Sequence, residues 1–210
     1  MASTDTRPRR ALIVIDVQNE YFTPSGLAIT HPPAAQSLGH ITRAVQAAQA
    51  AAVPVVVVQH ELPVGAPIFA SGSEGWKLHP DIAAFTPDLL VQKTLPSVFA
   101  RTPLADWLQE RQIDTLSIVG FMTHNCNAST VFEGFHRGYT VEVLSDATGA
   151  LAYSNDAGSA SAEEIHRVFS VVFHSNFAAV ATTDAWITAV QNSATLPRGN
   201  ILESNRRAAA

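Results

Sequence analysis

Cys126 is the only cysteine of this 210-residue chain, and its surroundings suit a reactive thiol. The mostly apolar run Leu116–Val119 precedes it, Gly120 breaks that run, and a helix-compatible stretch follows. This order predicts a buried strand, a turn, and a thiol delivered to the start of a helix, where free amides favour thiolate over thiol. We therefore predict that Cys126 is a nucleophile. The alternative is a lone cysteine that serves as a small buried hydrophobe.

Two ionisable residues occupy comparable positions after other apolar runs. Asp16 directly follows the run 11–15, and Lys93 directly follows 88–92. Such runs are typical of strands buried in a parallel sheet, whose carboxyl ends meet at one edge where ligands bind. Taken singly, the aspartate also suits a turn and the lysine a solvated surface. Together with Cys126, they are expected to converge.

That combination has a defined chemistry. The carboxylate of Asp16 would accept the thiol proton and later pass it to the leaving group. Lys93 would keep the carboxylate ionised and stabilise the sulfur anion. Backbone amides of the turn before Cys126 would bind the oxyanion of a tetrahedral intermediate. The constellation predicts hydrolysis of an amide or related acyl compound through a thioester.

The elements that must position these residues alternate along the chain. Strands are expected at 11–15, 53–58, 88–92, 115–119, 140–144 and 177–180, and helices at 34–52, 102–112, 125–137, 160–173 and 183–191. This alternation predicts an α/β fold, a three-layer doubly wound sheet of about six mainly parallel strands with helices on both faces.

The domain organisation is expected to be simple. Residues 1–10 are polar and predicted to be a disordered N-terminal flank, 11–192 a single domain, and 193–210 a loosely ordered C-terminal tail. The segment 60–87 is rich in proline and glycine and reads as a long irregular loop, which in a compact domain is usually functional.

Composition excludes several classes of function. The formal charge is −5, and the one basic cluster, Arg7–Arg10, is predicted to be solvated, so no nucleic-acid partner is expected. One cysteine cannot form an internal disulfide. No apolar stretch is long enough to span a bilayer, and the N-terminus lacks a signal-peptide pattern. These features predict a cytoplasmic protein with no membrane partner.

The motifs resemble those of the isochorismatase-like cysteine hydrolases, from about residue 10 to 187. The resemblance is carried by Asp16–Phe22, Lys93 with Ser97–Phe99, Gly120–Cys126, Arg137–Tyr139 and Asp146-Ala147. It implies a catalytic triad of Asp16, Lys93 and Cys126. It also implies oxyanion donors in the amides of Met122 and Cys126, a cis peptide between Phe121 and Met122, and a structural role for Asp146.

The resemblance also bears on substrate and cofactor. The family contains isochorismatases, nicotinamidases, carbamoylsarcosine and ureidoacrylate amidohydrolases and streptothricin hydrolase, and some isochorismatases lack the cysteine, so Cys126 favours an amidase. Nicotinamidases carry a metal-binding Asp-x-His pattern after the second strand, where this chain reads Gln59–Pro63. No metal or other cofactor is therefore expected. His60, Glu61 and His79 are predicted to be solvated loop residues; the alternative is that they bind a metal ion, for which their spacing is not diagnostic. The family implies a homodimer or homotetramer.

Four residues are candidates for the wall of a substrate pocket. Phe22 and Phe99 stand at motif positions and would line an apolar pocket for a small planar substrate, or else pack in the core. Trp76 lies in the long loop, where it would line the pocket or anchor the loop. His124, two residues before Cys126, would line the pocket or orient the turn.

The predicted function is thus a cysteine-dependent hydrolase of a small amide or ureido compound. Two alternatives stay open. One is a vinyl-ether hydrolase of the isochorismatase type, and the other is a non-catalytic binding module that retains a relic site.

Overall fold

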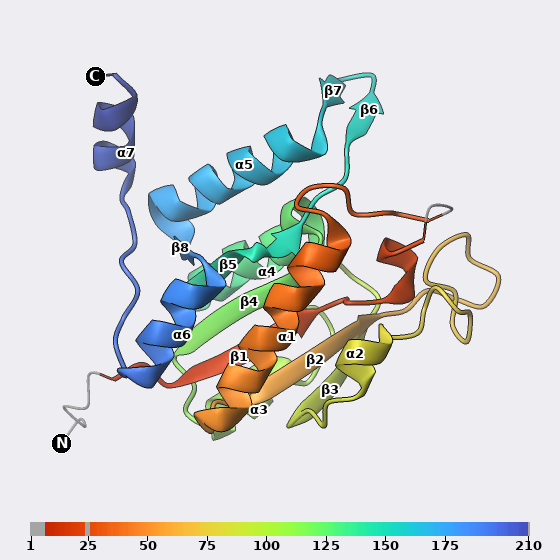
Figure 1. The fold of residues 1–210 in the computed structure, drawn as a ribbon, viewed down its shortest axis with the longest axis horizontal. Helices are drawn as coiled ribbons and strands as arrows, with labels where there is room; N and C mark the ends of the chain where they lie inside the picture. Colours follow the sequence, from red (N-terminus) through yellow and green to blue (C-terminus); the bar gives the residue numbers. More distant parts are fainter. Residues whose placement is uncertain (1–6, 24–25, 210) are drawn as a thin grey trace.

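Six parallel strands form the central sheet of the computed structural model, which describes residues 7–23 and 26–209. The strand order is β3-β2-β1-β4-β5-β8 (Figure 1). The strands are β1 (Arg10–Ile15), β2 (Val55–His60), β3 (Leu89–Lys93), β4 (Thr115–Phe121), β5 (Thr140–Gly149) and β8 (Ala179–Ala181). From β1 the chain adds β2 and β3 on one side and then β4, β5 and β8 on the other, so the topological switch point lies between β1 and β4. Ligands of such sheets bind at the switch point, beyond the carboxyl ends of the strands.

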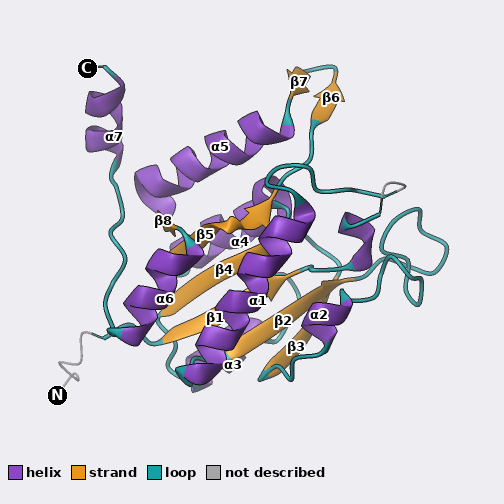
Figure 2. Ribbon diagram, in the orientation of Figure 1, coloured by secondary structure: helices purple, strands orange, loops and turns teal. Residues whose placement is uncertain are grey.

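Helices cover both faces of the sheet (Figure 2). On one face, α1 (Ala34–Ala50), α2 (Pro80–Ala83) and α6 (Thr183–Gln191) pack on one core cluster, and on the other α3 (Leu104–Glu110) and α4 (Ala128–His136) pack on a second. Alternate residues of β1 and β2 enter the two cores, which is why these strands read as unbroken apolar runs. The predicted doubly wound α/β fold is confirmed.

Four α-helices and strands of the described residues lie outside the predicted set, and the first of them, α2, forms within the segment 60–87 that was expected to be an irregular loop. A hairpin of β6 (Tyr153–Asn155) and β7 (Gly158–Ala160) precedes α5 (Ala162–Val172), and the tail contains α7 (Ile201–Ala208). The side chain of Asn200 accepts a hydrogen bond from the amide of Glu203 and so caps α7. The tail, expected to be loosely ordered, therefore carries a regular helix.

The second half of β5 was also missed, because the predicted strand ended at residue 144. Asp146 consequently lies inside β5, and its carboxylate accepts hydrogen bonds from the amide and hydroxyl of Thr183 at 2.8 and 2.7 Å. It thereby fixes the first residue of α6 against the sheet. In the described part of the chain, no helix combines the length and apolar character needed to cross a membrane.

Arg10 corrects the prediction of a solvated N-terminal flank. It is the first residue of β1, is 4% exposed, and forms an ion pair with Glu142 of β5 at 2.8 Å between Nη2 and Oε1. Arg9 is exposed and pairs with Asp114. Residues 1–6 of the predicted flank lie outside the described residues.

Candidate active site

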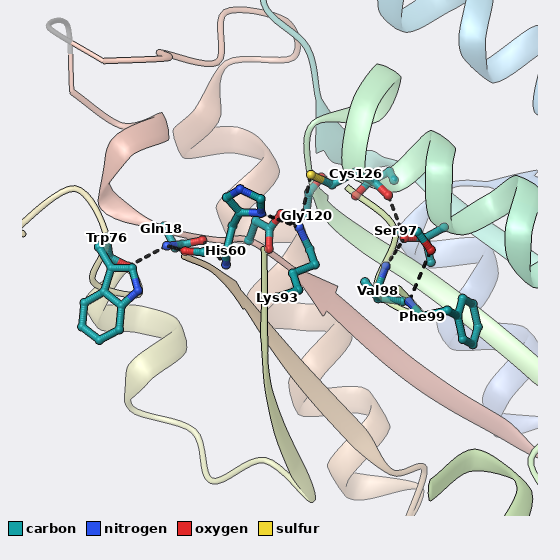
Figure 3. Close-up of polar contacts among 12 residues, drawn as sticks. Gln18, His60, Trp76, Lys93, Ser97, Val98, Phe99, Gly120 and Cys126 are labelled. Carbon is teal, nitrogen blue, oxygen red and sulfur yellow. Dashed lines mark hydrogen bonds and ion pairs between the residues drawn. The ribbon is translucent and has the colours of Figure 1, made fainter. Parts of the chain in front are cut away.

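The structure brings Asp16, Lys93 and Cys126 together at the carboxyl edge of the sheet. Figure 3 shows the side chain of Lys93 directed at Cys126. Asp16 directly follows β1, Lys93 is the last residue of β3, and Cys126 lies in a π-helical turn between β4 and α4. The ammonium nitrogen of Lys93 is 2.6 Å from Oδ2 of Asp16 and 3.3 Å from Sγ of Cys126. Both side chains of the ion pair are 0% exposed.

The approach of β4 to β1 depends on a glycine. Gly120 has φ +102°, and a Cβ at this position would lie 2.0 Å from the carbonyl oxygen of Ile15. No other residue fits between the end of β4 and the residue that precedes Asp16. The peptide Phe121–Met122 is cis, as the family resemblance implied. The side chain of Asn127 donates to the carbonyl of Gly120 at 2.8 Å and ties the turn together.

Burial is the largest influence on the pKa of Cys126. It raises the pKa of Cys126 above its ordinary value, the carboxylate of Asp16 raises it further, and Lys93 opposes both. Burial alone would lower the pKa of Lys93, but Asp16 and Cys126 raise it above its ordinary value. The resting site therefore holds a thiol beside an ammonium. The sequence-based expectation that the helix start favours thiolate is outweighed by burial and by Asp16.

One carboxylate oxygen of Asp16 is not used in the ion pair with Lys93. Its Oδ1 is buried and has no hydrogen-bond partner among the described residues. A carboxylate oxygen of Asp16, a ring nitrogen of His60 and Sγ of Cys126 lie within 4.8 Å of one another. These are also the described residues that could hold a metal ion, and the ammonium of Lys93 already contacts all three.

The loop after Lys93 is tied to the helix that follows Cys126. The hydroxyl of Ser97 donates to Glu133 of α4, and the amide of Val98 donates to Oγ1 of Thr130 at 3.3 Å. The same Oγ1 donates to the carbonyl of Cys126 at 2.7 Å. The motif around residues 97–99 therefore fixes the lysine loop relative to the cysteine turn, as Figure 3 shows.

A pocket of about 340 Å³ opens above the thiol. Aromatic and apolar side chains form most of its wall, among them Tyr21, Phe69, Met122 and Tyr153. Both residues whose amides were expected to bind the oxyanion, Met122 and Cys126, line it. Its shape and lining fit a small organic ligand.

The described residues that line this pocket include neither Phe22 nor Phe99. Phe22 packs against Phe121 with ring centroids 5.9 Å apart. Phe99 is 4% exposed, stacks on Tyr139, and lies under the guanidinium of Arg137. Both residues thus follow the core-packing alternative. At these motif positions the two rings pack against residues of the surrounding core.

Trp76 and His124 are also outside that lining. The backbone carbonyl of Trp76 accepts hydrogen bonds from the side-chain amides of Gln18 and Gln59 at 2.6 and 2.9 Å. These bonds anchor the long loop to the segment that follows β1 and to β2. The centroid of the His124 ring lies 4.9 Å from that of Tyr153, which lines the pocket. Burial, followed by the charge of His166, lowers the pKa of His124 to about 4.

Sequence reasoning missed His60. Expected in a solvated loop, it is the last residue of β2, pairs in register with Lys93, and lines the pocket. Its Nδ1 lies 3.0 Å from the ammonium of Lys93. A signal was present, since His60 comes two residues after the apolar run 53–58, much as Asp16 follows the run 11–15. His79 instead caps α2 through the amide of Asp81.

Comparisons with known proteins agree with this geometry. Residues 10–185 match the isochorismatase domain. A Burkholderia xenovorans LB400 protein described provisionally as an isochorismatase has a crystal structure that superposes with a TM-score of 0.96 and 58% identity, over 98% of each chain. The uncharacterised isochorismatase family protein YddQ of Bacillus subtilis is 30% identical over 84% of this chain and 98% of its own. Ureidoacrylate amidohydrolase RutB of Methylobacterium radiotolerans is 31% identical over 90% of this chain and 82% of its own.

The match spans most of the chain, from the first strand to the start of α6. It includes all the residues that meet at the carboxyl edge of the sheet. The family resemblance seen in the motifs is confirmed, and this chain belongs to the isochorismatase family of hydrolases.

Proposed function

We propose that this protein is a cysteine-dependent hydrolase that cleaves a small amide or ureido compound through a thioester. The observation that carries the proposal is the contact of one ammonium, that of Lys93, with both the Asp16 carboxylate and the Cys126 sulfur, which lines a pocket of about 340 Å³. A nucleophile, a base and a charge-stabilising group within hydrogen-bond reach are the parts that covalent acyl transfer needs.

The first half of the reaction forms the thioester. Oδ1 of Asp16 takes the proton of the Cys126 thiol as the sulfur attacks the substrate carbonyl carbon. The amides of Met122 and Cys126 bind the resulting oxyanion. Collapse of the tetrahedral intermediate breaks the carbon–nitrogen bond, and Asp16 gives its proton to the departing nitrogen. Lys93 stays an ammonium throughout and stabilises the anionic sulfur and carboxylate in turn.

The second half regenerates the enzyme. Asp16, ionised again, takes a proton from a water molecule, and the hydroxide attacks the thioester carbonyl. The carbon–sulfur bond then breaks, the product leaves as a carboxylic or carbamic acid, and the proton returns to the sulfur. A resting thiol is consistent with the raised pKa of Cys126, whose burial and contact with Asp16 favour the neutral form.

The pocket and one relative support the substrate class. A volume of about 340 Å³ is near the lower end of the about 300–1,000 Å³ usual for small-molecule sites, which suits a compact substrate. Tyr21, Phe69 and Tyr153 provide apolar walls, and Thr94 and Asn125 provide polar groups. The relative RutB is named for an amidohydrolase activity on a ureido compound.

The test is an ammonia-release screen over small primary amides and ureido compounds, with Cys126→Ala and Cys126→Ser as controls. We expect turnover of at least one compound, and a fall to the uncatalysed background in both variants without loss of the fold. An alanine variant that hydrolysed its substrate at an undiminished rate would refute covalent catalysis. Pyruvate release from an enol-pyruvyl ether, with no ammonia from any amide, would favour the vinyl-ether alternative.

A further inference from the structure

The backbone of His60 is held firmly at the mouth of the site. Its amide donates to Oε1 of Gln18 at 2.8 Å, and its carbonyl accepts from Nε2 of Gln18 at 2.9 Å. The edge of its ring meets the ring of Phe69, with centroids 5.4 Å apart. The ring position is therefore set by β1, β2 and the long loop together, before any substrate is present.

The contact with Lys93 settles which nitrogen of His60 carries the proton. An ammonium can only donate, so Nδ1 of His60, 3.0 Å from Nζ, must be the acceptor. Burial, and next the charge of Lys93, lower the pKa of His60, so the ring is neutral at pH 7. A neutral ring whose Nδ1 accepts carries its hydrogen on Nε2.

The ammonium of Lys93 has no donor left for a substrate. Its three N–H groups face three acceptors, in Asp16 at 2.6 Å, His60 at 3.0 Å and Cys126 at 3.3 Å. Nε2 of His60 is in the opposite situation. Among the described residues no protein group accepts its hydrogen, and His60 is one of the residues that line the pocket. Figure 3 shows the His60 ring beside Lys93.

We propose that His60 is a substrate-recognition residue, whose Nε2–H donates a hydrogen bond to an acceptor atom of the bound substrate while Nδ1 is held by Lys93. This deepens the proposed function and rests on it. It narrows the substrate to an amide or ureido compound that bears, beside the group under attack, a carbonyl oxygen or heteroaromatic nitrogen directed at the end of β2. A purely apolar acyl group would leave this donor unpaired on binding.

Two substitutions distinguish the roles of the two ring nitrogens of His60. In His60→Asn the short amide reaches toward Lys93, where its oxygen replaces the Nδ1 acceptor, but it ends before the position of Nε2. In His60→Gln the longer side chain brings an amide N–H close to the position of Nε2. Both are neutral and polar, so they form a matched pair that differs in the donor presented to the pocket.

The test uses alkylation of Cys126, which needs no known substrate. Iodoacetamide carries a carbonyl acceptor next to its reactive carbon, and iodoethane has the same leaving group but no acceptor. The ratio of their second-order rate constants cancels any general change in thiol reactivity. We expect His60→Asn to lower this ratio about tenfold relative to the wild type, the cost of about one hydrogen bond. His60→Gln should keep it within about threefold.

Equal ratios in all three proteins would overturn the proposal, and so would an equal loss in both variants. Circular dichroism and thermal unfolding verify that each variant is folded. The result is independent of turnover. A lowered ratio in His60→Asn, combined with no ammonia release from any compound, would leave the recognition role intact and refute the proposed hydrolase.

Discussion

The two ends of the central strand β1 each carry a buried ion pair, and the pairs differ in how fully they are hydrogen-bonded. At the amino end, the carboxylate of Glu142 accepts from Arg10 through both oxygens and also from Ser117 and Trp186. At the carboxyl end, Asp16 accepts from Lys93 through Oδ2, and its Oδ1 lacks a partner among the described residues.

The difference separates a structural pair from a chemical one. A buried charge is tolerated when its lone pairs are satisfied, and the Arg10–Glu142 pair joins β1 to β5 in this way. An unpaired carboxylate oxygen beside a thiol is costly to keep, but it provides the vacant acceptor that proton transfer requires. The comparison predicts that each pair affects a different measurement.

The largest effect is expected for Asp16→Asn. The amide cannot take the thiol proton, so kcat/KM should fall by about 10²–10⁴-fold, the usual contribution of a positioned base. The measurement is steady-state kinetics on the best compound of the ammonia screen. Glu142→Gln is the matched control at the other end of β1, and its activity per folded molecule should equal that of the wild type. Comparable losses in both variants would mean that the two pairs are not functionally distinct.

The free energy of unfolding should depend more on the Arg10–Glu142 pair than activity does. Glu142→Ala leaves the guanidinium of Arg10 buried without its counter-charge, so the free energy of unfolding should drop by about 3–5 kcal/mol. Urea denaturation measures it. The control is Arg43→Gln, which removes the exposed pair with Asp184 and should cost about 1 kcal/mol or less. An Arg43→Gln loss as large as that of Glu142→Ala would contradict the structural assignment.

A smaller effect is expected in the pH dependence of alkylation. Burial and the charge of Asp16 raise the pKa of Cys126, so its reaction with iodoacetamide should keep accelerating above about pH 8.5, where an ordinary cysteine levels off. Asp16→Asn removes the negative charge of Asp16, so the pH profile of alkylation in this variant should shift to lower pH. Glu142→Gln should leave the profile in place. A wild-type rate that levels off at about pH 8.5 would contradict the raised pKa, and one that levels off below about pH 7 would show that the resting sulfur is a thiolate.

Much of this site followed from local sequence pattern. Apolar runs marked the buried strands, and the ionisable residue after each run marked the edge at which it would emerge. Asp16 and Lys93 could be placed in this way because the carboxyl ends of parallel strands share one edge. The same argument applied to His60, but the proline- and glycine-rich segment that follows it favoured a loop assignment.

Other features had no local signal. Tyr21 and Tyr153 line one pocket from segments more than a hundred residues apart, and Tyr153 belongs to a hairpin that the sequence pattern did not indicate. The motif residues Phe22 and Phe99 marked the right neighbourhood, yet their rings pack against Phe121 and Tyr139. A motif shows that a position matters. It does not show which way its side chain faces.

The sequence by itself determined the parallel α/β architecture, the family, and the three strand ends that carry the reactive groups, because these depend on residue type and short-range periodicity. Only the tertiary structure decided the protonation of Cys126, the tautomer of His60 and the unpaired oxygen of Asp16. Each of these depends on burial and on the charges of side chains that the strand order β3-β2-β1-β4 brings into contact. The strength of an electrostatic interaction depends on the distance between two groups in space, which cannot be read from their separation along the chain.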